Sequence, residues 1–368
     1  MPMASTSRTG LPRRIVVTGA SGNVGTALLR RLAAHPAQLD IVAIARRIPP
    51  ARDPYAAAKW CAVDLAAPDA ARVLTPIFAE ADAVVHLAWG FQPSHRRDYL
   101  RQVAVDGTRA VVTAAADAGV GHVIHMSSAA VYSDGAYGRE VDESWAREGV
   151  PTCVYSVDKV AAEKFLDDFE TGTNVPVLTR FRPGFIGQLV SGSGLERYVL
   201  PEFVPAGITN HLPLIPIDHG LTIPAVHSDD VADALVAALE RRVPGPFNLG
   251  APTPVGARDF AAPFDCPTIP VPRWGLSALA EATWRLRLQP VQGGWIDLAY
   301  TCPMLDCSRA REELGWSPKY DGPEVWSETV RGMRSAMGTD SPVLSPRSAR
   351  ERLAALVERG PIGRRIPS

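Results

Sequence analysis

The first half of the chain alternates between short apolar runs and longer segments with helical spacing. The apolar runs predict strands, because a strand that is buried on both faces reads as a nearly continuous hydrophobic segment. They lie at residues 14–18, 40–45, 60–63, 83–87, 122–126 and 176–181. Segments with helical spacing lie at residues 23–34, 67–79, 96–118 and 155–170. This alternation predicts βαβ units, and therefore an α/β fold with a doubly wound parallel sheet of the Rossmann type.

The pattern changes after Gly187, where small residues and prolines interrupt the chain. Proline cannot donate a ladder hydrogen bond, so long strands are not expected there. We predict a smaller, loop-rich C-terminal lobe that binds the substrate. The predicted divisions are a flexible tail over 1–13, a Rossmann domain over 14–187, a mainly substrate-binding lobe over 188–337 with 228–250 returning to the core, and a tail over 338–368. Within this tail, residues 349–359 have helical spacing, and the tail is either a mobile appendage or carries a docking helix.

Charge and composition exclude several classes of protein. The 368 residues include 38 Lys and Arg against 39 Asp and Glu, a net charge of −1. This balance argues against a nucleic-acid clamp or a polybasic membrane anchor. There is no apolar run of the roughly 18 residues that a membrane helix needs, and no secretory pattern at the start. The five scattered cysteines have neither disulfide nor zinc spacing, which predicts a cytoplasmic protein without a metal site.

A glycine-rich turn joins the first predicted strand to the first helix, Thr18-Gly-Ala-Ser-Gly-Asn-Val-Gly25. Glycine allows a tight turn off the strand, a close approach of backbone to a pyrophosphate, and close packing of the helix on the strand. The helix N-terminus then offers N–H groups to phosphates. We therefore predict a dinucleotide cofactor bound by Gly19, Ser21, Gly22, Asn23, Val24 and Gly25.

Further cofactor contacts are expected where other strands end, because open α/β sheets bind ligands at the carboxyl ends of their strands. Asp64 and Leu65 follow the third strand, and a carboxylate there can accept a hydrogen bond from the adenine amino group. The alternative is that Asp64 caps a helix. Leu87 and Ala88 end the fourth strand, where backbone can pass close to the cofactor, while the preceding His86 is equally a core residue.

Residues with the chemistry for proton transfer follow the fifth strand. Ser127 and Ser128 come directly after it, and Tyr155 and Lys159 lie four residues apart on the next helix. Residues at i and i+4 share a helix face. A neighbouring ammonium and an oxidised nicotinamide ring favour the phenolate, which lowers the tyrosine pKa from about 10. The pattern predicts Tyr155 as general acid/base, Ser128 as a contact to the substrate oxygen, and Lys159 as a contact to the nicotinamide ribose.

Taken together, these motifs resemble the short-chain dehydrogenase/reductase superfamily, in its extended branch, the NAD-dependent epimerase/dehydratase family. The resemblance covers residues 14 to 330 and rests on the segments above together with Arg182-Pro-Gly184, His227-Ser-Asp-Asp-Val-Ala232, Phe247-Asn-Leu-Gly250 and Asp306-x-Ser-Arg-Ala-Arg-x-x-Leu-Gly-Trp316. It implies a seven-stranded core, a small substrate lobe and the roles given to Ser128, Tyr155 and Lys159. It also adds Ser127 and Pro183 to the cofactor contacts, and implies a homodimer built on the helices near 96–118 and 155–170.

The sequence departs from this family at four places. Ala104 stands where members have an asparagine of a proton relay, and Phe185 and Ile223 stand where nucleotide-sugar enzymes have an asparagine and a diphosphate-binding arginine. Ala129 and Ala130 replace the acidic pair of the dehydratases. A diphosphate without a cation loses a strong contact, so we expect a less charged substrate. Three tryptophans either line an apolar pocket or pack the lobe, namely Trp274, Trp284 and Trp295.

We therefore predict an NAD(P)-dependent oxidoreductase acting on a secondary alcohol or ketone of a small molecule, with no nucleic-acid or membrane partner. Two alternatives are an NAD-dependent sugar or nucleotide-sugar epimerase and a cofactor-binding protein without catalysis. Ala45 occupies the place of the acidic residue that binds the ribose in NAD-selective sites, and Arg46 and Arg47 follow it. A guanidinium there suits a 2′-phosphate, which favours NADP. If both arginines are solvated, NAD is the cofactor.

Overall fold

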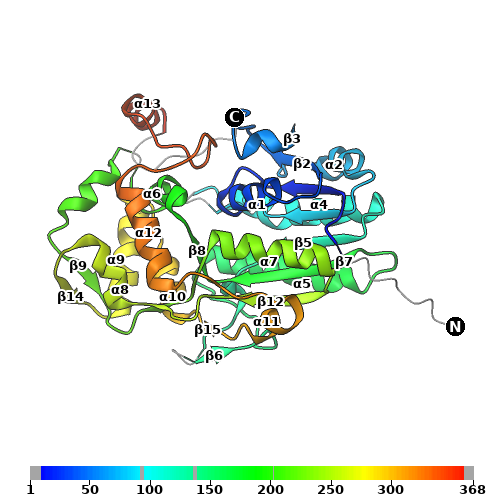
Figure 1. Cartoon of the computed structure of the whole chain (residues 1–368). Coiled ribbons are helices and arrows are strands. Elements are labelled where there is room, and N and C mark those ends of the chain that lie inside the picture. Colours follow the sequence, from blue (N-terminus) through cyan, green and yellow to red (C-terminus); the bar gives the residue numbers. More distant parts are fainter. Residues whose placement is uncertain (1–9, 92–94, 136–138, 202, 360–368) are drawn as a thin grey trace.

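Seven parallel strands form one central sheet in the computed structural model, which describes residues 10–91, 95–135, 139–201 and 203–359 (Figure 1). The strand order is β12-β7-β5-β4-β1-β2-β3. The strands are β1 (Arg14–Thr18), β2 (Asp40–Ala45), β3 (Lys59–Ala62), β4 (Ala83–His86), β5 (His122–Met126), β7 (Val177–Pro183) and β12 (Gly245–Leu249). The predicted doubly wound Rossmann sheet is confirmed. Its order reverses between β1 and β4, where such sheets bind ligands.

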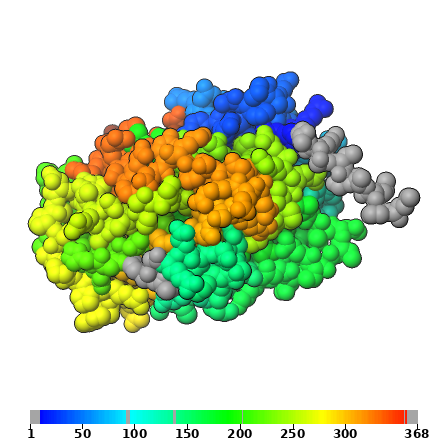
Figure 2. Space-filling view, turned by 60° about the horizontal axis from the view of Figure 1, so that its bottom comes forward, coloured from blue at the N-terminus to red at the C-terminus, as the bar shows by residue number. Residues whose placement is uncertain are grey.

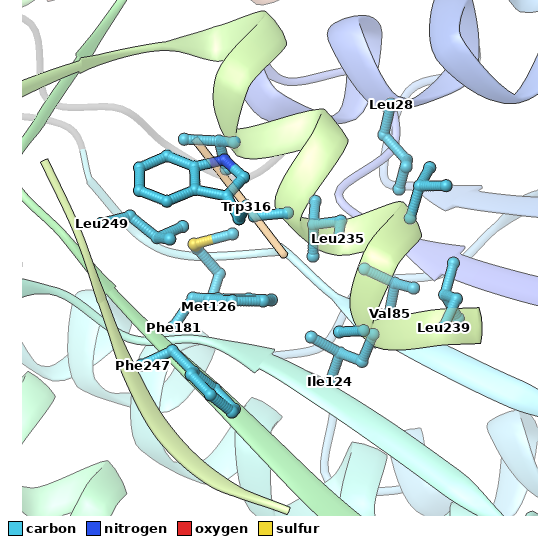
Figure 3. Close-up of a cluster of buried hydrophobic side chains, with 14 of the residues drawn as sticks. Leu28, Val85, Ile124, Met126, Phe181, Leu235, Leu239, Phe247, Leu249 and Trp316 are labelled. Carbon is cyan, nitrogen blue, oxygen red and sulfur yellow. The ribbon is translucent and has the colours of Figure 1, made fainter. Parts of the chain in front are cut away.

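Helices cover both faces of this sheet, as the alternation of the two periods predicts. They are α1 (Asn23–Ala33), α2 (Ala70–Phe78), α3 (Arg97–Arg101), a π-helix (Gln102–Asp106), α4 (Gly107–Asp117), α5 (Val154–Glu170) and α7 (Ser228–Arg241). On the face covered by α1 and α7, buried side chains from helices and strands form one core (Figure 3). On the other face, side chains of α2, α4 and α5 form a second core against the same strands.

The smaller lobe contains more helix than the sequence predicts. Its helices are α6 (Gly192–Val199), α8 (Ala257–Ala261), α9 (Arg273–Arg285), α10 (Gly293–Thr301) and α12 (Gly322–Arg334). Its short strands are β9 (Ile215–Ile217), β10 (Thr222–Ile223), β13 (Val255–Gly256) and β14 (Thr268–Pro270). The strands are short, as its prolines predict, but the expectation of a loop-rich lobe is wrong because α9, α10 and α12 pack its interior.

Several small elements connect the lobe to the Rossmann unit. β8 (Phe185–Gly187) pairs with β11 (Ala225–His227), and β6 (Glu140–Val141) pairs with β15 (Met304–Leu305), which precedes α11 (Ser308–Leu314). After β11 the chain returns to the core through α7 and β12. In the space-filling view, residues of about 300–335, in orange, lie between the yellow part of the lobe and the blue and green parts of the Rossmann unit (Figure 2).

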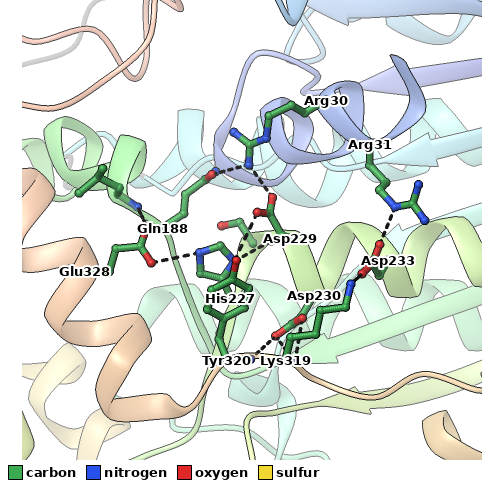
Figure 4. A network of polar contacts seen from close by, with 12 residues as sticks. Arg30, Arg31, Gln188, His227, Asp229, Asp230, Asp233, Lys319, Tyr320 and Glu328 are labelled. Carbon is green, nitrogen blue, oxygen red and sulfur yellow. Dashed lines mark hydrogen bonds and ion pairs between the residues drawn. The ribbon is translucent and has the colours of Figure 1, made fainter. Parts of the chain in front are cut away.

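A polar network fixes the lobe to the helices beside the sheet (Figure 4). Arg30 of α1 donates hydrogen bonds to Gln188, at 2.9 Å, and to Asp229 of α7, at 2.5 Å. The buried carboxylate of Asp230 accepts hydrogen bonds from the backbone N–H of Lys319, at 3.0 and 3.1 Å. These contacts hold the segment before α12 against α7, so that the lobe has a fixed position over the carboxyl edge of the sheet.

In the described ranges, none of the helices has both the length and the apolar character needed to cross a membrane. The same ranges hold no group of three or more His, Cys, Asp or Glu side chains that is arranged to bind a metal ion. Of the predicted N-terminal tail, residues 1–9 lie outside the described residues. At the other end, residues 338–348 run along the body of the protein to α13 (Ala349–Arg359).

Candidate active site

The glycine-rich turn between β1 and α1 has the geometry that its sequence predicts. Gly19 has a φ of 72°, and a Cβ added there would lie 2.5 Å from the backbone nitrogen of Ala88. A Cβ on Gly25 would lie 2.5 Å from the carbonyl oxygen of Ala20, so this glycine lets α1 pack on the turn. At Gly22 the nearest neighbour would be the carbonyl of Gly19 at 3.2 Å, and its outer side is open. The turn therefore fits the pyrophosphate of a dinucleotide at the N-terminus of α1.

The side chains of this turn bind protein groups. Asn23 donates to the carbonyl of Ile186 at 3.1 Å, and its amide oxygen accepts from Gln188 at 2.7 Å and Ser228 at 2.9 Å. Ser21 is buried, and its carbonyl accepts a hydrogen bond at 2.6 Å from a C-terminal serine, Ser341. These residues and Val24 can therefore bind phosphates through the backbone N–H groups of the first helical turn.

Exposed arginines follow β2 at the place predicted for the adenosine ribose. Arg46 donates a hydrogen bond to the hydroxyl of Tyr99, and its guanidinium carbon lies 5.9 Å from the centre of that ring. Asp64 accepts from the backbone N–H of Ala66 at 3.0 Å. The alternative that Asp64 caps a helix is wrong, because the N-cap of α2 is Asp69.

The predicted proton-transfer residues lie together at the start of α5. The Ser128 side chain lies close enough to the Tyr155 hydroxyl to lower its pKa. Lys159 is buried, its Nζ lies 5.8 Å from the centre of the Tyr155 ring, and it donates to the carbonyl of Met126 at 2.7 Å. The structure thus brings Ser128, Tyr155 and Lys159 to one place, at the carboxyl end of β5.

Burial dominates the pKa of this tyrosine in the protein itself. Burial raises the pKa of Tyr155 above its ordinary value, and the Ser128 side chain opposes that rise. Burial also brings the pKa of Lys159 well below its ordinary value. The Lys159 ammonium group points to the Met126 carbonyl and to the ring of Trp89, 3.4 Å from its centre. The lowering of the phenol pKa that the sequence predicts includes the charge of an oxidised nicotinamide ring, so it stays a prediction for the protein with its cofactor.

An aromatic cluster surrounds the Tyr155 ring, and the sequence analysis identified only one of its members besides Tyr155. We use this name for Trp89, Phe91, Tyr155, Tyr198 and Trp295. Trp295 stacks on Tyr155 with 5.1 Å between ring centres, and Phe91 meets it edge-on at 5.1 Å. Phe91 also contacts Tyr198 at 4.8 Å. The surface beside the phenol is therefore apolar and built from flat rings.

The other two tryptophans lie elsewhere. Trp284 is buried and stacks on His95 with 3.9 Å between ring centres, whereas Trp274 is 74% exposed. Of the three tryptophans that the sequence offers as pocket residues, only Trp295 contacts Tyr155. Trp89 and Phe91 were missed because they follow β4 in a connecting segment without periodicity, although they come directly after the predicted cofactor contacts Leu87 and Ala88.

A buried network of ion pairs and hydrogen bonds lies beside the site. It includes Ser127, which the sequence predicts as a cofactor contact. The Ser127 hydroxyl donates to the carboxylate of Glu163 at 2.5 Å. Arg182 makes two hydrogen bonds to the same carboxylate, at 2.9 and 2.6 Å, and Arg147 a third at 2.9 Å. The side chain of Ser127 is thus structural, which leaves only its backbone for a cofactor. Glu163 was missed, although it continues the four-residue spacing of Tyr155 and Lys159 along α5.

The substituted family positions lie in apolar surroundings. Phe185 meets Trp326 edge-on with 5.6 Å between ring centres, and Ile223 packs among the lobe's hydrophobic residues. Pro183 ends β7, where it pairs in register with Leu249. Ala104 lies in the π-helix, and its carbonyl accepts a hydrogen bond from Thr108 at 2.6 Å. The position of the relay asparagine therefore carries no polar side chain.

Comparison with known families and structures agrees with this arrangement. The model of the NAD dependent epimerase/dehydratase family matches residues 15–250. A search of curated proteins gives no match. Among solved structures, MoeE5 in complex with UDP-glucuronic acid and NAD is similar with a TM-score of 0.64 and 21% identity, over 88% of this chain and 99% of that one.

Two further structures show the same fold. The UDP-glucose 4-epimerase of Thermus thermophilus, in complex with NAD, has a TM-score of 0.65 and 18% identity, over 88% of this chain and 99% of its own. A putative epimerase of Burkholderia cenocepacia has a TM-score of 0.64 and 22% identity, over 89% of this chain and all of its own.

Proposed function

Since the chain belongs to the NAD-dependent epimerase/dehydratase family, we propose that it is an NAD(P)-dependent oxidoreductase that interconverts a secondary alcohol and a ketone on a small, weakly charged molecule. One observation carries this proposal. The hydroxyl of Tyr155 lies beside Ser128 and the tyrosine ring lies among aromatic rings, at the sheet edge that also holds the glycine-rich turn. This arrangement suits proton transfer at an apolar carbonyl compound.

The residues of the chain have distinct roles in this reaction. The turn from Gly19 to Gly25 would hold the cofactor's pyrophosphate, and a nicotinamide cofactor, when bound, supplies or accepts the hydride. Ser128 orients the substrate oxygen by a hydrogen bond. Tyr155 donates its proton to that oxygen in reduction and takes it back in oxidation. Its raised pKa keeps the phenol protonated, which suits the donor role in the reduction direction.

The substrate class follows from what surrounds the hydroxyl. Trp295 and Phe91 present ring faces and edges to Tyr155, and flat apolar groups stack well on such surfaces. The places where nucleotide-sugar enzymes hold an amide and a cation carry Phe185 and Ile223, both packed against apolar neighbours. A sugar diphosphate would therefore be bound without its charge-assisted contacts.

Net cofactor turnover tests this function. We expect NADPH oxidation, followed by absorbance, with aryl ketones as substrates, and neither reduction of NADP+ nor an epimerised product with UDP-glucose. A calorimetric titration with UDP-glucose should show binding weaker than millimolar. An epimerised sugar without net cofactor turnover, or micromolar binding of UDP-glucose, would contradict the proposal and favour the epimerase alternative.

We further propose that the cofactor is NADP(H), although MoeE5 and the UDP-glucose 4-epimerase of Thermus thermophilus were solved in complex with NAD. Arg46 follows Ala45 directly, and the Asp40 carboxylate is bound to Lys59, at 2.7 Å, at the far end of β2. Arg46→Ala should weaken NADPH binding about tenfold, which corresponds to about 1.4 kcal/mol for one lost charge-assisted contact. Dissociation constants for NADPH and NADH would measure this effect, with Arg13→Ala, at the opposite end of the sheet, as the control. Wild-type protein that binds NADH as tightly as NADPH would contradict the preference.

The homodimer on the helices near 96–118 and 155–170 and the cytoplasmic location stay predictions from the sequence. So does the absence of nucleic-acid and membrane partners.

A further inference from the structure

The segment that follows α12, residues 337–345, lies against the glycine-rich turn, and we call it the C-terminal strap. Ser341 is fully buried, and its hydroxyl donates to the carbonyl of Ser21 at 2.6 Å. Figure 1 shows this part of the chain leaving α12 and passing beside α1 before it reaches α13. The strap therefore contacts the predicted cofactor site directly, although it lies far from it in the sequence.

A chain of hydroxyl groups makes a second connection between the strap and the turn. The hydroxyl of Thr26, on α1, donates to the carbonyl of Gly22 at 2.8 Å. Because that hydroxyl has a single hydrogen, its 3.0 Å contact with Tyr55 must have the tyrosine as donor, and Thr339 then donates to Tyr55 at 2.7 Å. Tyr55 is fully buried. The carbonyls of Ser21 and Gly22 are thus both tied to the strap, the first directly and the second through two hydroxyl groups.

These two carbonyls belong to the peptide groups that set the direction of the N–H groups at the start of α1. A peptide group is planar, so the carbonyl of Ser21 turns together with the N–H of Gly22, which donates to the carbonyl of Gly19 at 3.0 Å. In the same way the carbonyl of Gly22 turns with the N–H of Asn23, at the open end of the helix. The bonds to the strap therefore fix the orientation of the backbone groups that a phosphate would use.

The strap is also fixed to the lobe, through α6. Arg197 donates to the carbonyl of Pro342 at 2.9 Å and to the carbonyl of Ser345 at 2.5 Å. The carbonyl of Met337 accepts from the hydroxyl of Ser193 at 2.7 Å and from its backbone N–H at 3.1 Å. The lobe thus holds the strap in place independently of the turn, so the strap can restrain the turn.

We propose that Thr339 and Ser341 are positioning residues for the cofactor, which hold the glycine-rich turn in the conformation that binds the diphosphate of a dinucleotide. Glycine restricts the backbone little, so a turn with three glycines loses much conformational freedom when it binds a ligand. The strap removes part of that freedom before the ligand binds. The inference rests on the dinucleotide cofactor of the proposed function, but on neither hydride transfer nor the choice between NAD and NADP.

Calorimetric titrations of the full chain with NADPH, NADH and ADP test this role. Ser341→Ala should raise the three dissociation constants by one common factor, about three- to tenfold for one lost hydrogen bond, because all three ligands carry the diphosphate. Tyr55→Phe breaks the second connection without changing the shape of the side chain, and it should weaken all three ligands in the same way. In ketone reduction, Ser341→Ala should raise the Michaelis constant for the cofactor and leave kcat unchanged, because it removes binding that ground state and transition state share.

A matched serine and a measurement without ligand complete the test. The exposed Ser348 accepts a hydrogen bond from the N–H of Glu351 at 3.2 Å, at the start of α13, and Ser348→Ala should leave the three dissociation constants unchanged. In the protein without cofactor, the amides of residues 19–26 should exchange hydrogen faster in Ser341→Ala than in the wild type. Because coupling is reciprocal, bound NADH should slow exchange in the strap of the wild type.

Unchanged dissociation constants in both Ser341→Ala and Tyr55→Phe would overturn the role of the strap. A loss in Ser348→Ala as large as in Ser341→Ala would do so too, because it would show a general effect of the C-terminal segment. Wild-type protein that binds none of the three ligands would contradict the proposed function and this role with it. Dinucleotide binding without ketone turnover would contradict the redox function alone, because the comparison of dissociation constants would stand.

Discussion

Tyr155→Phe should reduce turnover by about 10²–10⁴-fold, the usual contribution of a general acid/base. The substitution removes only the hydroxyl that lies beside Ser128 and leaves the ring stacked on Trp295. Apolar packing of the aromatic cluster is therefore kept, and the dissociation constant for NADPH should change little, because the phenol is not a phosphate ligand. Steady-state kinetics with a reactive ketone, together with a titration of the cofactor, would measure both quantities.

A matched tyrosine in the lobe supplies the control. The hydroxyl of Tyr300, on α10, accepts a hydrogen bond from the backbone N–H of Asp218 at 3.0 Å, and it lies outside the aromatic cluster. Tyr300→Phe should therefore leave turnover within about twofold. If Tyr155→Phe turned over at the wild-type rate, another group would have to move the proton.

The sheet could be predicted from the sequence because most of its strands are buried on both faces; the edge strand β3 is the exception. Apolar runs such as Arg14–Thr18 and His122–Met126 are continuous and short, and the helices between them keep their 3.6-residue spacing. The lobe's helices have weaker signals. α10 begins with two glycines, and α12 begins with Gly322 and Pro323, which read as a turn. The capping box of Asp321 and Glu324 was the signal that marks the start of α12.

In the candidate site too, contacts between residues close in the sequence could be predicted, whereas contacts between distant residues could not. Tyr155 and Lys159 were found because their spacing on one helix fixes their relation. By contrast, the contact of Ser341 with Ser21 joins residues 320 positions apart, and no local pattern encodes such a contact. The direction of the Lys159 side chain was also beyond the sequence, because it depends on where Trp89 lies after β4.

Glu163→Gln should lower the free energy of unfolding by about 3–5 kcal/mol, the cost of leaving a buried charge without its partner. The Glu163 carboxylate is 1% exposed and binds the guanidinium of Arg182, which is 2% exposed, by two hydrogen bonds. A neutral amide would keep the shape but present N–H donors to this cation. Urea denaturation of the variant and the wild type would give the difference.

The pH dependence of the difference in unfolding free energy between the wild type and Glu163→Gln identifies the cause of that difference. The hydrogen bonds and charge of Arg182 and the hydroxyl of Ser127 outweigh burial and hold the pKa of Glu163 below its ordinary value of 4.5. A lowered folded-state pKa gives stability that is fully present above 4.5 and is lost as the pH falls through the folded value. The wild-type advantage over the variant should therefore shrink in acid. Glu148→Gln is the control, because its ion pair with Lys164, at 3.6 Å, is exposed and contributes at most about 1 kcal/mol. A loss in Glu163→Gln no larger than in this control would show that Arg182 is stabilised by other groups.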